Sequence, residues 1–251
     1  MSKLSIVVPS FNEADNVRPL VEQLDEALSS IEHEIIFVDD SKDNTPDVIR
    51  EIQKEKPHVR LEHRVNETGL ATAVLKGFTL ATGDYIACMD ADLQHPPKIL
   101  KYMFYALEEG YDFCIPSRFI PGGSDGGLNL YRKLVSGVAR YIGKIALPCL
   151  RKVTDPTSGL FMIRREALKD ADLQPIGWKI MVEVLAMCSY NSIIEIPYTF
   201  QDRESGESKI SGKVTMEYLL QVKDLMKRAK VKKSVPVSRW TVDKMLECDN
   251  K

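Results

Sequence analysis

The sequence predicts an α/β domain in which a mostly parallel sheet is flanked by helices. Short, almost continuously apolar runs such as Leu4–Val8 and Tyr85–Met89 alternate with segments whose apolar residues recur at helical spacing. This pattern is typical of strands that helices cover on both faces. Acidic residues follow several of these runs directly, at the carboxyl ends of the strands, where such sheets bind ligands.

The first 125 residues alternate predicted strands and helices. The motif Ser10-Phe11-Asn12-Glu13 has the pattern of a capping box, which predicts that a helix starts directly after the first strand. Thr45-Pro46 predicts the next helix start, with Thr as N-cap and Pro in the first position. Two further helices are expected over 69–81 and 96–109. The predicted strands of this half are Leu4–Val8, Ile35–Val38, Val59–Glu62, Tyr85–Met89 and Phe113–Ile115.

The second half begins with a glycine-rich segment, Gly122–Gly127, which predicts a flexible loop. Beyond it we expect two more strands, over 160–163 and 193–196, a basic amphipathic helix over 128–147, and further helices over 179–189 and 213–230. No linker separates these segments, so residues 1–233 are expected to form one domain with halves 1–125 and 126–233. Residues 234–251 are expected to form a loose tail.

Composition narrows the class of protein. The chain has 251 residues, of which 44% are hydrophobic and 28% charged, and this excludes a collagen-like or wholly disordered chain. Its five cysteines include no CxxC pair, which argues against a zinc site or a disulfide framework and favours a reducing compartment. The start has no signal-peptide pattern, and the most apolar long stretch is too short and too charged to span a membrane.

Charge is divided between the halves. Residues 1–125 carry a net charge of -10 and residues 126–233 carry +8. The basic second half suggests an anionic partner, although a solvated helix face would give the same count. The helix expected over 128–147 has an apolar face made of Leu130, Leu134, Val138, Tyr141 and Ile145. Its basic flanks are Arg132, Lys133, Arg140 and Lys144. Such a helix fits an anionic membrane surface or, equally, packing against the core.

Asp90-Ala91-Asp92 follows the predicted strand Tyr85–Met89. Side chains two residues apart on a strand share a face, so the two carboxylates would lie together, with Gln94 next to them. Like charges this close repel unless a cation compensates them, and oxygen ligands favour Mg²⁺ or Mn²⁺. The pattern therefore predicts a metal site for a diphosphate, and a solvated turn is the alternative. Such a DxD motif is weak evidence on its own.

Two further polar segments belong to the same hypothesis. Asp39-Asp40 ends the second strand, where a carboxylate can accept hydrogen bonds from a base or ribose. The alternative is a turn aspartate. Arg203 and Lys209 lie in a polar loop after the last predicted strand, and they could clamp phosphate oxygens. A solvated charged loop is the alternative there.

Together these motifs resemble the inverting family-two glycosyltransferases of the GT-A fold and, more narrowly, the polyprenyl-phosphate (dolichyl-phosphate) mannose synthases. The resemblance covers residues 4 to about 230, and the order and spacing of its motifs carry it. The matching segments are Val8–Glu13, Val38–Thr45, Gly69–Phe78, Met89–Pro97, Ser117–Phe119, Asp155–Leu160 and Arg203–Lys209.

The resemblance implies roles for individual residues. The residues implied to hold the nucleoside of a nucleotide sugar are Pro9, Phe11, Glu13, Val38 and Asp40. The diphosphate and its metal ion are implied to bind at Asp90, Ala91, Asp92 and Gln94. The cations implied around the diphosphate and the acceptor phosphate are Arg118, Lys179, Arg203 and Lys209. The acceptor phosphate is further implied to meet Arg132 and Ser136, and the residues expected to carry catalysis are Asp92, Arg118 and Arg203.

The implied reaction transfers mannose from GDP-mannose to a polyprenyl (dolichyl) phosphate with inversion, and Mg²⁺ or Mn²⁺ is the cofactor. A phosphate monoester has a second pKa near ~6, so the acceptor is already anionic at neutral pH and needs no general base. His95, the nearest candidate base, is expected to be structural. The expected location is cytoplasmic and peripheral, on the cytosolic face of a membrane, reached directly or through a membrane-embedded partner subunit. No nucleic-acid partner is expected.

Other functions stay open from the sequence. UDP-glucose would serve the same motifs as donor. A catalytically silent nucleotide-binding protein at a membrane surface is the non-enzymatic alternative, although the retained Asp90, Asp92, Gln94 and Arg203 argue against it. A nucleotidyltransferase is disfavoured, because no glycine-rich phosphate loop follows the first strand.

Overall fold

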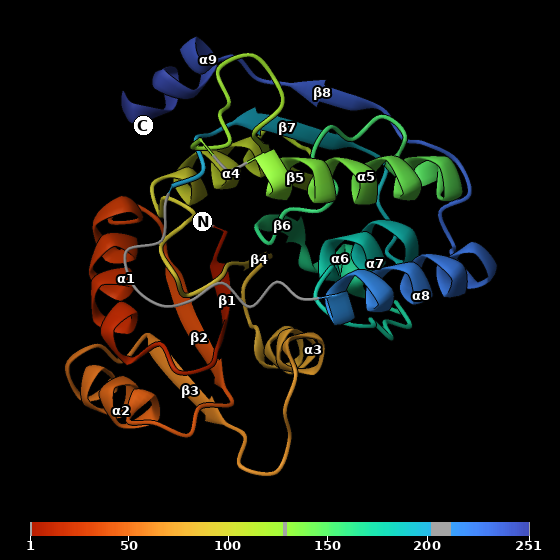
Figure 1. Ribbon diagram of the computed structural model, residues 1–251. Helices are drawn as coiled ribbons and strands as arrows, with labels where there is room; N and C mark the ends of the chain where they lie inside the picture. Colours follow the sequence, from red (N-terminus) through yellow and green to blue (C-terminus); the bar gives the residue numbers. More distant parts are fainter. Residues whose placement is uncertain (1, 128–129, 202–211, 251) are drawn as a thin grey trace.

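The structure is a computed structural model that describes residues 2–127, 130–201 and 212–250, without the side chains of 130–136, 212–214 and 250. Its strands form one sheet in the order β3-β2-β1-β4-β6-β5-β7-β8 (Figure 1). The strands are β1 Leu4–Ser10, β2 His33–Asp39, β3 Val59–His63, β4 Tyr85–Cys88, β5 Phe113–Ser117, β6 Phe161–Arg164, β7 Ile193–Pro197 and β8 Val237–Arg239.

One strand runs against the others. β6 is antiparallel to both of its neighbours, β4 and β5, whereas the other paired strands of the described chain are parallel. The mostly parallel α/β architecture predicted from the sequence is therefore confirmed. Because β1, β2 and β4 are parallel, their carboxyl ends lie at one edge of the sheet, and this edge carries the polar segments that the sequence analysis singled out.

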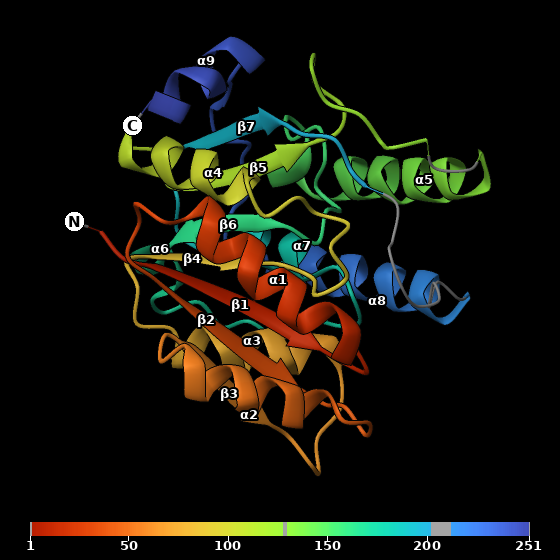
Figure 2. The ribbon, with the colours of Figure 1, turned by 90° about the vertical axis from the view of Figure 1, so that its left-hand side faces the viewer.

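Helices cover both faces of the sheet (Figures 1 and 2). Side chains alternate across β1, so that Leu4 and Ile6 join the core beneath α1, α2 and α4, whereas Val7 faces α3. A second core lies between β5, β6 and helices α7 and α8. The helices are α1 Ala14–Ala27, α2 Thr45–Glu55, α3 Leu70–Leu80, α4 Ile99–Glu108, α5 Leu130–Ala146, α6 Arg165–Leu168, α7 Ile180–Met187, α8 Gly212–Arg228 and α9 Val242–Leu246.

The helix starts differ in detail from the predicted ones. The capping box at 10–13 does not form: Asn12 has a φ of +57°, and Glu13 is the N-cap of α1 without a side-chain cap hydrogen bond. Helix α2 includes Thr45, with Asn44 as N-cap. The Thr45 hydroxyl instead donates to Asp43 and accepts from the backbone N–H of Glu13, at 2.6 and 3.0 Å. This polar residue therefore joins two loops rather than capping its own helix.

The expectation of a loose tail after residue 233 is wrong. Strand β8 extends the sheet by pairing with β7, and the N–H of Trp240 donates to the carbonyl of Glu195 at 3.0 Å. Beyond β8, Met245 and Cys248 are buried in the core beside α4, where the Tyr102 hydroxyl donates to Asp249 at 2.8 Å. A few buried side chains among polar ones hold this segment against the core. Because their spacing follows neither a strand nor a helix period, the sequence pattern did not reveal this packing.

The structure also bears on membrane insertion. Among the residues that the structure describes, no helix is both long and apolar enough to cross a bilayer.

Candidate active site

A cleft of about 670 Å³ lies at the carboxyl ends of β1, β2 and β4. Loops that follow these strands form one wall, and residues 157–159 and 178–181 of the second half form the other. The predicted site residues that line it are Pro9, Phe11, Glu13, Asp40, Asp90, Ala91, Asp92 and Lys179. The structure thus brings together positions that are up to 170 residues apart in the chain.

Asp90 and Asp92 lie in the loop after β4, not on an extended strand as predicted. The strand ends at Cys88, and Leu93 has a φ of +59°, which turns the chain back. Asp92 is 6% exposed, whereas 41% of the Asp90 side chain is accessible. Both residues nevertheless line the cleft, although they differ in how far solvent reaches them.

A glycine gives room to this pair. A Cβ on Gly159 would lie 2.5 Å from Oδ2 of Asp90, so a larger residue there would displace the carboxylate. The two carboxylates line the same cleft, and carboxylate oxygen is the ligand type that Mg²⁺ and Mn²⁺ prefer. Gln94, predicted as a further ligand, does not line the cleft. Its side-chain amide donates to the carbonyl of Gln201 at 3.3 Å.

The loop after β1 carries Phe11 at the rim of the cleft, where its ring is 40% exposed. Two hydrogen bonds hold this loop against the one after β2. The N–H of Asn12 donates to the Ser41 hydroxyl at 2.7 Å, and the N–H of Lys42 donates to Oδ1 of Asn12 at 3.1 Å. An exposed aromatic ring on a fixed loop is suited to stacking against a nucleoside base.

Asp40 is held by a residue that the sequence analysis did not single out. Arg64, directly after β3, donates to both carboxylate oxygens at 2.7 and 2.6 Å, and the N–H of Gly69 adds a third hydrogen bond at 2.9 Å. This buried pair fixes the Asp40 carboxylate in the cleft wall. Val38, also predicted to meet the nucleoside, is fully buried with Ile36 and does not line the cleft.

Asp39 has a structural role instead. Its buried carboxylate accepts hydrogen bonds from the hydroxyls of Ser10 and Ser41, at 2.7 and 2.6 Å, and lies 2.9 Å from Nδ1 of His63. These contacts join the ends of β1, β2 and β3. The two adjacent aspartates therefore divide between holding the loops and lining the cleft.

The predicted cations are arranged in different ways. Arg118 does not line the cleft; its guanidinium donates to both oxygens of the buried Asp155 at 2.7 and 2.9 Å. Burial opposes the charge of Arg118, but the hydrogen bonds and charge of Asp155 outweigh it and raise the pKa of Arg118. Arg203 and Lys209 lie outside the described residues. Arg132 and Ser136 lie on α5, and their side chains are outside the description.

Lys179 is the predicted cation that the structure places in the wall of the cleft. Its ammonium donates to the carbonyl of Thr157 at 3.0 Å. Burial, reinforced by the charge of Arg118, lowers the pKa of Lys179 from its ordinary value. An anion bound in the cleft would offset both effects and favour the charged ammonium.

His95 is packed as a structural residue. It is 3% exposed, stacks on Tyr198 with ring centroids 5.6 Å apart, and meets the edge of Phe200. Burial and the nearby charge of Arg118 lower the pKa of His95 to about 3. The ring is therefore neutral at neutral pH, and its weak basicity and burial make it unsuited to act as a general base.

The second wall contains residues to which the sequence analysis gave no role. Thr157 and Ser158 precede β6, and Trp178 precedes Lys179 with 41% of its surface exposed. One signal was available, because Trp178 is one of only two tryptophans in the chain and lies beside a predicted cation. The exposure of Trp178 and the contact of Gly159 with Asp90 depend on tertiary structure, so the sequence alone does not reveal them.

Comparisons with known proteins identify the family of the chain. The model of the family described as glycosyl transferase family 2 matches residues 5–171. A dolichol-phosphate mannosyltransferase of Pyrococcus furiosus is 42% identical over 226 residues, which cover 90% of this chain and 64% of that protein. A dolichol-phosphate mannosyltransferase of Saccharomyces cerevisiae is 38% identical over 234 residues, covering 88% of this chain and 86% of that protein. The family predicted from the motifs is thereby confirmed.

Solved structures agree in fold. Glucosyl-3-phosphoglycerate synthase of Mycobacterium tuberculosis, crystallised with Mn²⁺, UDP and phosphoglyceric acid, superposes with a TM-score of 0.66. The match covers 90% of this chain and 79% of that one at 18% identity. A second crystal structure of the same enzyme also gives a TM-score of 0.66. At this identity the likeness establishes the fold, and the predicted GT-A class is confirmed.

Gly159→Ala tests the proximity of this glycine to Asp90. The added methyl group would displace the carboxylate, and we expect the affinity for Mn²⁺ in the presence of a nucleoside diphosphate to fall by about tenfold. A Mn²⁺ titration in which electron paramagnetic resonance reports the free ion measures this affinity. Gly137→Ala is the matched control, because among the described residues nothing lies within 4 Å of its Cβ position. Equal Mn²⁺ affinity in both variants would contradict the assignment.

The lowered pKa of His95 also predicts how the free energy of unfolding depends on pH. The folded chain takes up this proton only near pH 3, whereas the unfolded chain takes it up near ~6.5, so the unfolded state binds more protons between these values. Stability is therefore lost as the pH falls through this window. Replacing His95 with Phe should reduce the slope of unfolding free energy against pH by about 1.4 kcal/mol per pH unit. Urea titrations from pH 4 to 7 measure the slope, and parallel curves would refute the prediction.

Proposed function

The chain belongs to glycosyl transferase family 2, and on that premise we propose that it transfers mannose from GDP-mannose to a polyprenyl (dolichyl) phosphate. The reaction inverts the sugar carbon and gives a β-linked product. One observation carries the proposal: Asp90 and Asp92 line the same cleft as Phe11, Glu13 and Asp40. A cleft that combines carboxylates with an exposed aromatic side chain fits a diphosphate joined to a nucleoside. The relatives named dolichol-phosphate mannosyltransferase support the sugar and the acceptor.

Asp90 and Asp92 are the residues that would hold a divalent metal ion. When bound, Mg²⁺ or Mn²⁺ neutralises the charge that builds on a leaving diphosphate. The chain adds Lys179 in the cleft wall, whose ammonium would provide positive charge to the same phosphates, and their negative charge would favour its protonated form. Phe11 offers its ring to the base, and the rigid Asp40–Arg64 pair shapes the wall beside it.

The acceptor needs no side-chain base in this proposal. A lipid phosphate is anionic at neutral pH, so its oxygen attacks the anomeric carbon directly while the bond to the diphosphate breaks. One in-line displacement of this kind inverts the configuration. The burial of His95, and the lowering of its pKa to about 3, agree with a mechanism that leaves this histidine out.

A lipid acceptor requires the protein to contact a membrane, and α5 and α8 of the second half offer a surface for this contact. The two helices lie on the same side of the molecule (Figure 2). They pack together through Tyr218, whose hydroxyl donates to the carbonyl of Ala139 at 2.8 Å. On α5, Val138, Tyr141 and Ile145 are 52%, 69% and 62% exposed. Apolar side chains left exposed between basic ones favour membrane contact over packing against the core.

On α8, Met216, Leu219 and Leu220 are also exposed, and Lys223 and Lys227 follow them along the helix. We therefore propose that the protein binds the cytosolic face of a membrane peripherally, through α5 and α8. A membrane-embedded partner subunit is the other route to the same location.

A transfer assay tests the proposed reaction. Incubation with Mn²⁺, a short polyprenyl phosphate and either labelled GDP-mannose or labelled UDP-glucose should label the extracted lipid only with GDP-mannose. Asp92→Asn should lower transfer by about 100-fold or more without unfolding the chain, because it removes charge from the metal site. Asp47→Asn, at a side chain that is 74% exposed on α2, is the matched control.

The outcomes of this assay separate the alternatives. Label from UDP-glucose would replace the donor assignment. Nucleotide binding without transfer would favour the silent-protein alternative, and full activity of Asp92→Asn would refute the metal assignment. Arg132→Ala adds a test of the acceptor site, because it should raise the KM for the lipid phosphate more than that for the donor.

Sedimentation with lipid vesicles tests the membrane surface. The protein should bind vesicles that contain anionic phospholipid, and binding should weaken with salt, because part of it is electrostatic. Replacing Tyr141 and Ile145 with Asp should reduce the bound fraction severalfold. Val65→Asp, at an exposed apolar residue remote from α5 in the chain, is the control. Vesicle binding that both variants retain would rule out α5 as the contact.

A further inference from the structure

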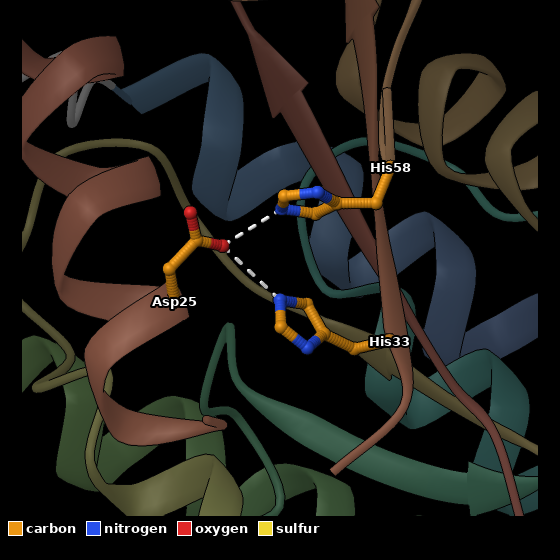
Figure 3. Close-up of side chains that lie close together, drawn as sticks. All are labelled: Asp25, His33 and His58. Atoms are coloured by element: carbon orange, nitrogen blue, oxygen red, sulfur yellow. Dashed lines mark hydrogen bonds and ion pairs between the residues drawn. The ribbon is translucent and has the colours of Figure 1, made fainter. Parts of the chain in front are cut away.

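Asp25, His33 and His58 form a cluster (Figure 3). The cluster lies at the opposite end of the sheet from the cleft, because His33 begins β2 and the cleft residue Asp40 follows it. The Nε2 atoms of His33 and His58 lie 3.2 and 2.8 Å from Oδ1 of Asp25. We propose that this cluster is a second metal site, which binds a transition-metal ion such as Zn²⁺ independently of the catalytic carboxylates. Imidazole nitrogen and a carboxylate are ligands that suit Zn²⁺, whereas Mg²⁺ prefers oxygen alone.

The hydrogen bonds of His33 point to a cation at this place. Its Nδ1 lies 2.9 Å from the carbonyl oxygen of Ile31, which can only accept, so Nδ1 carries the proton. A neutral ring has one N–H, and its Nε2 lone pair would then face the Asp25 carboxylate at 3.2 Å. Either a second proton or a metal ion must lie between these two atoms. A histidine that binds metal typically donates its other N–H to a backbone carbonyl in this way.

The distances also fit coordination. One ligand atom of each residue lies within 4.8 Å of the other two. In a tetrahedral site with bonds of about 2.0–2.1 Å, ligand atoms are about 3.3 Å apart, so only small side-chain shifts are needed. The rings of His33 and His58 are 5.1 Å apart and inclined by 75°, which lets both nitrogens converge on Asp25. Three protein ligands leave one position for water.

Regular structure holds the three ligands in place. His33 is the first residue of β2, Asp25 lies in the second half of α1, and His58 directly precedes β3. The carbonyl of His58 accepts from the N–H of Ile35 at 3.0 Å, so the two histidines lie where the pairing of β2 with β3 begins. A bound ion would therefore clamp α1, β2 and β3 together. Along β2 the cluster lies about 20 Å from Asp39, which separates it from the cleft.

Lys56 gives the site a neighbouring competitor. Its ammonium lies 2.5 Å from Oδ2 of Asp25, the oxygen that the histidines leave to it. The charge of Lys56 lessens the attraction of this site for a second cation, yet it leaves Oδ1 directed at the two imidazoles. Removing that charge should tighten metal binding, whereas in a simple ion-pair cluster it would only weaken the contacts of Asp25.

Zn²⁺ titration of the full-length, metal-free chain tests the proposal. A chromophoric chelator serves as competitor, and excess Mg²⁺ occupies the carboxylates of the cleft. We expect one Zn²⁺ per chain and a higher Tm with Zn²⁺ bound, because only the folded state assembles the ligands. His33→Gln and His58→Gln should weaken binding by at least about tenfold. His63→Gln, at the other end of β3, should leave it unchanged, and Lys56→Met should strengthen it.

A measurement on the unaltered chain keeps the test decisive if a variant fails to fold. The X-ray absorption spectrum of the Zn²⁺-bound protein should show scattering from two imidazoles, and the chain has only four histidines. Absence of Zn²⁺ binding, a spectrum with oxygen ligands alone, or equal affinity in His58→Gln and His63→Gln would overturn the proposal. None of these readouts uses transferase activity, so failure of the proposed function would not be mistaken for failure of this site.

Discussion

The concentration of negative charge at the carboxyl edge of the sheet is the constraint on which the site depends. Asp39, Asp40 and Asp92 are all buried there, and buried like charges at one edge of a sheet destabilise a fold unless they are compensated. Asp39 is stabilised by hydroxyls and His63, and Asp40 by Arg64. The contacts that compensate Asp39 and Asp40 also hold the loops at this edge in place. Asp90 and Asp92 line the cleft beside these loops, and their charge suits a cation bound together with a diphosphate.

Most of the fold could be predicted because its strands are buried on both faces. Continuous apolar runs such as those of β1 and β4 have few other interpretations in a chain with alternating amphipathic segments. The C-terminal segment could not be read in this way. Trp240, Met245 and Cys248 are buried singly between polar residues, and the position of β8 is set by β7, not by a pattern of its own.

Site residues that directly follow a predicted strand could be predicted from the sequence. Residues that join the site through contacts between distant parts of the chain were harder to predict. Asp40 and Asp92 were found because parallel strands bring their carboxyl ends together, and Phe11 was assigned through the family resemblance. Arg64 was missed, since an arginine after a strand carries no signal until its partner is known. Val38 was assigned to the ligand but is packed in the core, because side chains in a buried strand alternate between two cores.

The reversed direction of β6 has a consequence for which insertions the chain can tolerate. Because β6 is antiparallel to β4, its first residue, Phe161, pairs with Cys88 at the cleft. The segment before β6 therefore meets α5 through Thr154, whose carbonyl accepts from Arg140 at 3.4 Å, and reaches Asp90 at Gly159. Extra residues here would shift both contacts together. The connection that follows β6 leaves from the other edge and contributes to the cleft wall only at residues 178–181, so length variation is expected to accumulate in its first part.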